Sequence, residues 1–124
     1  MHPRKIYLIC PVRNVTADQQ RAVDTYAHQL TERGDDVHNP RYAVDQTDTT
    51  GVGICLAHFD AMDLADEVHV FWDATSTGSH FDLGMAFALD KPVVVVELLT
   101  PDSDAKSYAK VAAALRRGRE GTRP

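Results

Sequence analysis

Short apolar runs rich in β-branched residues alternate along this chain with longer stretches of helical periodicity. Such runs, bounded by turn residues, are typical of strands buried on both faces of a parallel sheet. They predict four strands, at residues 5–10, 37–38, 68–72 and 93–96. A helix-like stretch follows each strand after a short connection. This order predicts an α/β fold, in which helices cover both faces of a parallel sheet of four or five strands.

Capping residues and apolar spacing together bound the predicted helices. Thr16 and Gln19 form a capping box that predicts the start of the first helix, and Gly34 predicts its end. Apolar residues recurring at helical spacing predict three further helices, at about residues 53–65, 80–89 and 103–117.

The same spacing predicts which side of three of these helices is buried. The inward positions are Val23, Tyr26, Ala27 and Leu30 in the first helix, Cys55, Phe59 and Met62 in the second, and Tyr108, Val111, Ala112 and Leu115 in the last. Residues 41–50 have no clear period and predict a loop. Loops carried by a rigid scaffold often serve function, so this segment is the best candidate for a lid over a site.

Right-handed crossovers between these strands favour a three-layer α/β/α sandwich with the flavodoxin-like strand order 2-1-3-4. In that order the loops after Cys10 and Trp72 line one crevice at the carboxyl ends of the strands, where open α/β sheets bind ligands. The chain has neither a GxGxxG nor a GxxxxGK[ST] motif, so it carries neither the dinucleotide fingerprint nor a Walker loop.

The turn at 73–79 is rich in hydroxyl side chains and leads into a helix that contains Asp82. With the helix starting near Ser79, Asp82 lies in its first turn. There, unpaired N–H groups and the helix dipole favour an anion and should keep the carboxylate ionised at neutral pH. Ser79 and Asp82 also fit a capping box, in which the aspartate only satisfies backbone donors. The local pattern leaves both interpretations open.

Composition narrows the class of protein. The 124 residues, 44% apolar and 25% charged, suit one soluble globular domain, expected at residues 1–118 with a flexible tail at 119–124. No apolar run approaches the roughly 20 residues that span a bilayer, and two isolated cysteines predict reduced thiols in the cytoplasm. The net charge of −5 argues against binding duplex nucleic acid. The six histidines are scattered without zinc-site spacing, so we expect no metal and no cofactor.

A family resemblance comes from two segments, KIYLICPVRN at 5–14 and LADEVHVFWDATSTGSHFDLGMAFALDKPVVVV at 64–96. They combine a strand, a Gly/Ser turn, an acid-Leu-Gly-x-Ala run and a Lys-Pro-Val strand start. In this they resemble the nucleoside 2-deoxyribosyltransferase-like superfamily, which includes the nucleoside 5′-monophosphate N-glycosidases. The family's acid is a glutamate that attacks the anomeric carbon of the nucleoside sugar, and the matching position here is Asp82.

Further site residues follow from the resemblance, one position at a time. Tyr7 matches a strand-one tyrosine that helps to orient the nucleophile in this family. Arg13 falls where the monophosphate N-glycosidases have an arginine near the substrate, and Ser76 matches a serine that holds the 5′-phosphate. Hydroxyls and backbone amides at a helix start also suit phosphate on general grounds. The implied substrate-binding residues are Arg13, Asp73, Ser76, Gly78 and Ser79.

Three departures from the family pattern bear on function. Asp82 is one methylene shorter than glutamate, and misplacing a reacting atom by about 1 Å can cost about a hundredfold in rate. His58 stands where the family often has an acid that faces the base. It can protonate a leaving base, although a half-buried helix histidine with no chemical role is the alternative. The chain also ends after its fourth helix, where family members continue into a further strand and a segment that completes a neighbour's site.

Two functions therefore remain open. One is cleavage or transfer of the N-glycosidic bond of a nucleoside or nucleoside 5′-monophosphate, with Asp82 as nucleophile and Tyr7 and His58 as the other catalytic residues. The other is a non-catalytic module on the same fold that binds or senses a nucleotide or nucleotide-sugar. The resemblance also implies a homodimer, for which Phe59 and Met62 of the second helix offer a contact face.

Overall fold

Four parallel strands form the centre of the fold in a computed structural model that describes residues 3–43, 50–102 and 104–115. The strands are β1 (Lys5–Ile9), β2 (Asp36–His38), β3 (Glu67–Trp72) and β4 (Val93–Leu98). Their order in the sheet is β2-β1-β3-β4, and each neighbouring pair is parallel. The predicted flavodoxin-like order of four strands is confirmed.

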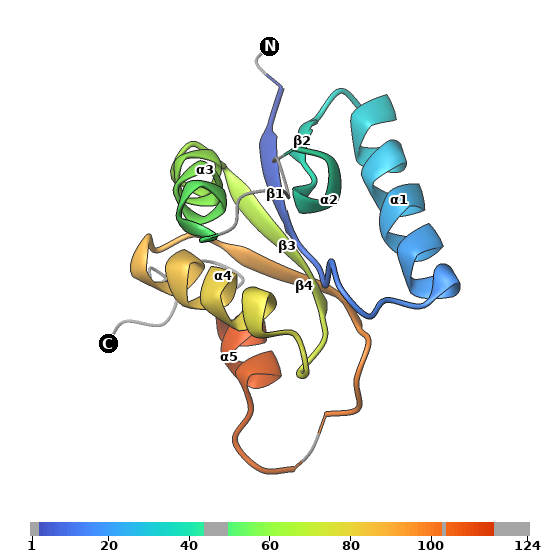
Figure 1. The fold of residues 1–124 in the computed structure, drawn as a ribbon, viewed down its shortest axis with the longest axis vertical. Coiled ribbons are helices and arrows are strands. Elements are labelled where there is room, and N and C mark those ends of the chain that lie inside the picture. The colour runs from blue at the N-terminus through green and yellow to red at the C-terminus, as the bar shows by residue number, and fades with distance from the viewer. Residues whose placement is uncertain (1–2, 44–49, 103, 116–124) are drawn as a thin grey trace.

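Helices cover both faces of this sheet and complete a three-layer sandwich. In Figure 1, α1 lies on one side of the strands, and α3, α4 and α5 lie on the other. The helices are α1 (Ala17–Glu32), α2 (Pro40–Ala43), α3 (Val52–Asp63), α4 (Thr77–Ala88) and α5 (Tyr108–Ala114). The predicted capping box of α1 is present. The Thr16 side chain accepts a hydrogen bond from the backbone N–H of Gln19, and the Gln19 side chain accepts one from the backbone N–H of Thr16.

Alternate residues of the strands feed two separate apolar layers, because successive side chains of a strand point to opposite faces. On the α1 face, Ile6 and Leu8 of β1 pack with Phe71 of β3 and with the buried stripe of α1. On the other face, Tyr7 and Ile9 pack with β3, β4 and the inner sides of α3, α4 and α5. Strands β1 and β3 are thus buried on both sides, as their sequence predicts. The prediction is wrong for most of β4, which lies at the edge of the sheet, where Val93 is buried and residues 94–96 are half-buried.

Helix α3 turns a different side to the core from the one predicted. Cys55 is exposed and Phe59 is 41% exposed, whereas His58 and Met62 are buried. The prediction failed for Cys55 and Phe59 because apolar residues occur all round this helix, so their spacing selects no single face. Met62 is fully buried in the core and is therefore unable to contribute to a contact face with another molecule.

Helix α5 also differs from its prediction. Its buried residues are Ala109 and Ala112, with Leu115 following, whereas Tyr108 is 61% exposed and Val111 is 39% exposed. The small alanines bring the helix close to β4, so the larger side chains lie outside the contact. Predicted helical residues 116–117 and the predicted tail at 119–124 lie outside the described residues.

The segment predicted as a loop at 41–50 begins with a helical turn. Pro40 starts α2 rather than only closing the second strand, which agrees with the preference of proline for the first position of a helix. Residues 44–49 lie outside the described part of the chain, so the predicted lid stays a prediction. No helix in the described ranges is both long and apolar enough to cross a membrane.

Polar side chains join the strands at the end of the sheet opposite to their carboxyl ends. Arg4 bonds Asp35 at 3.1 Å and Glu67 at 2.8 Å, so it joins the segments at the starts of β1, β2 and β3. Glu67 also bonds His69, which in turn bonds the hydroxyl of Tyr26 on α1 at 2.6 Å. This network fixes the strand starts and leaves the carboxyl ends open.

Candidate active site

A cleft of about 480 Å³ opens at the carboxyl ends of β1 and β3, where the flavodoxin-like order predicts a ligand site. This volume lies within the usual range for small-molecule pockets. Its walls are the loop after β1, the start of α2 at Pro40, helix α3, and the turn after β3 with the start of α4. Its lining includes Cys10, Val12, Arg13, Asn14, Ile54, Cys55, His58, Asp73, Thr75, Ser76, Gly78, Ser79, Phe81 and Asp82.

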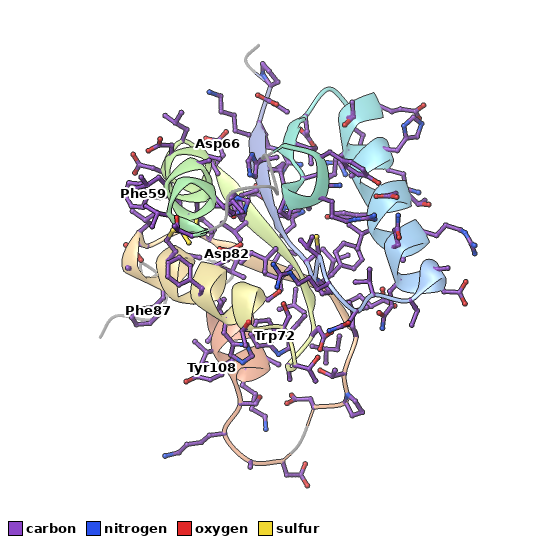
Figure 2. The ribbon with its side chains drawn as sticks, in the orientation of Figure 1. Phe59, Asp66, Trp72, Asp82, Phe87 and Tyr108 are labelled. Atoms are coloured by element: carbon purple, nitrogen blue, oxygen red, sulfur yellow. The ribbon has the colours of Figure 1, made fainter. Side chains whose placement is uncertain are left out.

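Asp82 and Tyr7 meet on one side of this cleft. The Tyr7 hydroxyl donates a hydrogen bond to Oδ2 of Asp82 at 2.9 Å, although the two residues are 75 positions apart in the chain. Tyr7 is fully buried on β1, and Asp82 is half-buried on α4. Figure 2 shows Asp82 between α4 and the strands. A buried ring thus holds one carboxylate oxygen, and no hydrogen bond from the described part of the chain engages the other, Oδ1.

The charge state of Asp82 is set by burial rather than by a helix end. Helix α4 begins at Thr77, so Asp82 is its sixth residue and lies in the second turn, contrary to the prediction. Loss of water around the carboxylate raises its pKa from 3.8 to about 6, although the bond from Tyr7 acts in the opposite direction. Asp82 is still ionised at pH 7, but its charge carries a desolvation free energy that a surface carboxylate does not have.

Ser76, and not Ser79, caps helix α4. The Ser76 side chain accepts a hydrogen bond from the backbone N–H of Ser79 at 3.2 Å. The capping-box interpretation of Ser79 and Asp82 is therefore wrong, and Asp82 is available for another task. Both serines have suitable side chains for a cap, so the sequence alone placed the helix start three residues too late.

The start of α4 combines several donors that suit an anion. Ser79 is 2% exposed, and its Oγ has no hydrogen-bond partner among the described residues. Gly78 has open space where a Cβ would stand, so a ligand can approach the backbone there. Thr77 and Gly78 occupy the first two helical positions, whose N–H groups have no partner within a helix. A phosphate is an anion of suitable size and charge for such a place.

Asp73 shapes the turn that carries these donors. Its Oδ1 accepts hydrogen bonds from the backbone N–H of Thr75 at 2.8 Å and from the Thr75 hydroxyl at 2.6 Å. Its backbone carbonyl accepts from the N–H of Ser76 at 3.0 Å. The N–H of Ala74 donates to Thr100 Oγ1 at 3.0 Å, which ties the turn to the segment after β4. Asp73 lines the cleft, as predicted, but its carboxylate already has partners in the turn.

Arg13 lies across the cleft from the turn, in the loop after β1. It is exposed and lines the cleft. The next residue, Asn14, has a φ of 58°, and asparagine adopts this left-handed backbone more readily than most residues. Arg13 thus lines the same cleft as the turn at 73–79, from a different loop.

His58 and a second histidine stand beside Tyr7. His58 is buried and lines the cleft, and its Nδ1 lies 3.2 Å from Nε2 of His38 on β2. The ring of His38 stacks on that of Tyr7 with centroids 4.9 Å apart. Burial lowers the pKa of both histidines, and the neighbouring His58 lowers that of His38 further.

Sequence reasoning missed His38. Its one available signal was its place at the end of the strand beside the one that carries Tyr7, since neighbouring parallel strands end at the same edge of a sheet. Among the described residues, no group of three His, Cys, Asp or Glu side chains is arranged to hold a metal ion. Asp82 and His58 therefore line the cleft together with the donors of the turn, and Tyr7 and His38 lie directly against them.

Several solved structures resemble this fold, among them the following three. The 2-deoxyribosyltransferase of Bacillus psychrosaccharolyticus aligns with a TM-score of 0.62 and 18% identity, over 86% of this chain and 89% of its own. The CMP N-glycosidase BcmB of Clostridium botulinum aligns with a TM-score of 0.52 and 21% identity, over 73% of this chain and 66% of its own. A conserved protein of Enterococcus faecalis V583 aligns with a TM-score of 0.64 and 20% identity, over 88% of this chain and 72% of its own.

No protein-family model and no curated protein sequence matches this chain. The structural likenesses nevertheless confirm, at the level of the fold, the resemblance that the two sequence segments indicate. The chain has the fold of the nucleoside 2-deoxyribosyltransferase-like proteins.

The raised pKa of Asp82 predicts that its charge opposes folding. Below pH 4 the carboxyl is protonated in both the folded and the unfolded chain, and above pH 6 the folded chain carries a buried charge. Stability should therefore fall as pH rises through this range. Asp82→Asn should raise the free energy of unfolding at pH 7.5 by about 2 to 3 kcal/mol, and the gain should vanish near pH 4. Urea denaturation at both pH values measures it.

The capping residue provides the control for that experiment. Ser76→Ala removes the side-chain acceptor at the start of α4 and should cost about 0.5–2 kcal/mol at either pH. If Asp82→Asn instead lowers the free energy of unfolding at pH 7.5, the charged carboxylate stabilises the fold. The conclusion that its charge destabilises the fold would then be wrong.

Proposed function

We propose that this protein cleaves the N-glycosidic bond of a nucleoside or nucleoside 5′-monophosphate, with Asp82 as the nucleophile. The observation that carries the proposal is the bond from the Tyr7 hydroxyl to Asp82 inside the cleft. A carboxylate that is desolvated, held by one oxygen and open on the other is suited to attack an electrophilic carbon. The shared fold with a 2-deoxyribosyltransferase and a CMP N-glycosidase supports the same chemistry.

In the proposed reaction, Oδ1 of Asp82 attacks C1′ of the sugar while the bond from C1′ to the base breaks. Tyr7 holds Oδ2, which keeps the carboxylate plane fixed, and burial makes the ionised oxygen more reactive than one in water. Water then hydrolyses the glycosyl ester and releases the sugar, or a second base accepts it. This is the double displacement of retaining glycosidases.

The turn before α4 is the proposed site of a 5′-phosphate. Ser76 and the buried, unpartnered hydroxyl of Ser79 offer donors on one side, and Arg13 offers a guanidinium on the other. Substrate would thus bind with its phosphate at the helix start and its C1′ near Asp82. The substrate-binding set is Arg13, Asp73, Ser76, Gly78 and Ser79, in which Asp73 shapes the turn through Thr75.

A nucleotide-binding module without catalysis is the second candidate, and one observation favours it. Aspartate is a methylene shorter than the glutamate of the resembling family, and the bond to Tyr7 holds it back towards β1. A ligand seated for a longer side chain would then lie beyond the reach of Oδ1. The two candidates share the cleft and differ only in turnover.

Substitution of Asp82 separates these candidates. Asp82→Asn keeps the size and the bond from Tyr7 but removes the charge, so release of free base from nucleosides and nucleotides should fall by at least about a hundredfold, as chromatography would measure. Activity of the native protein should also fall below about pH 6, as Asp82 becomes protonated. Asp82→Glu is the matched control, since it keeps the charge and extends the reach. Nucleotide binding with no cleavage by any of the three proteins would establish the binding module instead.

Substitution of Arg13 tests the phosphate site. Arg13→Ala should weaken binding of nucleoside monophosphates about tenfold to a hundredfold, because an arginine–phosphate hydrogen bond contributes about 1.5–3 kcal/mol. Affinity for the matching nucleosides should not change. Arg21→Ala is a suitable control, since Arg21 pairs with Asp18 on the exposed side of α1. Calorimetric titration measures the affinity for both ligands. Equal losses of affinity for the monophosphate and the nucleoside would show that Arg13 acts only in the fold.

A homodimer through α3 and α4 is the proposed assembly. Figure 2 shows Phe59 and Phe87 on the outer side of these helices, away from the sheet. Leu56, Phe59 and Phe87 of these two helices are each at least 41% exposed, and exposed large apolar side chains suit an interface. Phe59→Glu should therefore convert a dimer to a monomer in light scattering, whereas Tyr108→Glu on α5 should not. A native protein that is monomeric at high micromolar concentration would exclude the dimer.

A further inference from the structure

His38 and His58 meet between β2 and α3 in a fixed geometry. Nε2 of His38 lies 3.2 Å from Nδ1 of His58, and the two ring planes cross at 89°. At this distance one nitrogen donates and the other accepts, so the protonation states of the two rings depend on each other. Tyr7 contacts both rings, stacked on His38 and edge-on to His58. The residue that holds the nucleophile therefore also holds this pair.

Only one of the two rings lines the cleft. His58 lines it together with Asp82, whereas His38 is not among the lining residues. Because Nδ1 of His58 is engaged with His38, Nε2 is the nitrogen left for a ligand. No hydrogen bond within the described ranges reaches that atom. Nε2 of His58 is thus the nitrogen of the pair that a ligand in the cleft can engage while the contact with His38 is kept.

The groups around the pair decide how many protons it can hold. Burial lowers the pKa of both rings, and Asp36 on β2 opposes this for His38. Tyr7 stays neutral because burial beside Asp82 raises its pKa. Cys55 lies one turn before His58 on α3, and Asp82 on α4 reaches the pair only through Tyr7. Two imidazolium rings in contact would repel each other, so the pair takes up one proton and resists a second.

We propose that His38 and His58 share a single added proton, which His58 delivers from Nε2 to the base as it leaves the sugar. This inference rests on the proposed cleavage reaction, and it adds a role for His38, which the sequence did not indicate. His58 is the acid that touches the base. His38 is a positioning residue, which accepts the Nδ1–H of the His58 imidazolium and so fixes the tautomer that remains after transfer.

The step balances with the groups present in the cleft. As Oδ1 of Asp82 bonds to C1′, the bond from C1′ to nitrogen breaks and its electron pair passes to the base. The proton on Nε2 of His58 moves to the base, which departs neutral. His58 is then neutral, with its remaining proton on Nδ1 directed at Nε2 of His38. When water hydrolyses the glycosyl ester, the proton that water releases restores the imidazolium.

A substrate whose base needs no proton isolates this step. The base of a 7-methylguanine nucleotide already carries a positive charge and leaves as a neutral molecule, whereas guanine must be protonated. His58→Gln should slow release of guanine by about a hundredfold or more, a size typical of general acids, and change release of 7-methylguanine less than threefold. His38→Phe keeps a ring on Tyr7 and should slow only guanine release, by about tenfold. Equal losses on both substrates would show a purely structural role and overturn the proposal.

A titration of the unliganded protein tests the sharing of the proton without any turnover. Histidine ring resonances followed by NMR should show His38 and His58 moving together in one step, and His38→Phe should shift the titration of His58 to lower pH. His28→Phe is the matched control, since His28 pairs with Glu32 on the exposed side of α1. Two independent steps, or a His58 titration unaffected by His38→Phe, would overturn the sharing.

The two experiments also separate this inference from the reaction on which it rests. A native protein that releases no base from any nucleoside or nucleotide would overturn the proposed function and, with it, proton delivery. The NMR titration would still decide whether the two rings share a proton. If the native protein cleaves both substrates and the histidine substitutions slow both alike, the proposed function stands. Only the proposed role of the histidine pair would then be wrong.

Discussion

The hydrogen bond between Tyr7 and Asp82 is the interaction on which the candidate site depends. It joins the middle of the sheet to the second turn of α4 and keeps a half-buried carboxylate in one orientation. Such a bond forms only where β1 and α4 are close, and this closeness follows from the strand order β2-β1-β3-β4. The topology therefore creates the site, because it brings together residues from opposite halves of the chain.

The same tyrosine links two proposed steps of one reaction. Its hydroxyl holds the proposed nucleophile, and its ring face carries His38 while its edge meets His58. Because all four side chains are partly or fully buried, each is held by packing as well as by hydrogen bonds. A site built in this way changes little on binding a ligand, which lowers the entropic cost of reaching the reactive geometry. The proposed phosphate site is less fixed by packing, because its Arg13 is exposed on a loop.

Sequence patterns predicted the parts of this structure in which one physical effect dominates. The valine-rich β4 and the capping box at Thr16 each have a single consistent interpretation, and both are present. Where two effects compete, prediction failed. Helix α3 is apolar all round, so Cys55 and Phe59 were assigned inward although both are exposed. At α4 two serines suit the cap, and the choice of Ser79 placed Asp82 one turn too early.

His38 could not have been found from spacing at all. Its role comes from the register that sets it beside Tyr7 across the β1–β2 pairing, and register is a property of the folded sheet. The resemblance to a known family indicated Tyr7 and Asp82, but it offered no matching position for a second histidine. Residues of this kind become visible only when distant segments are placed together.

The bond between Ala74 and Thr100 has a consequence for any attempt to move this site into another protein. It fastens the turn after β3 to the segment that follows β4, so the geometry of the proposed phosphate site is not encoded by residues 73–79 alone. Transplanting that heptapeptide onto a different parallel sheet would carry over the hydroxyls and lose their alignment. The smallest portable unit is the turn, the first turns of α4 and the segment after β4 that bears Thr100.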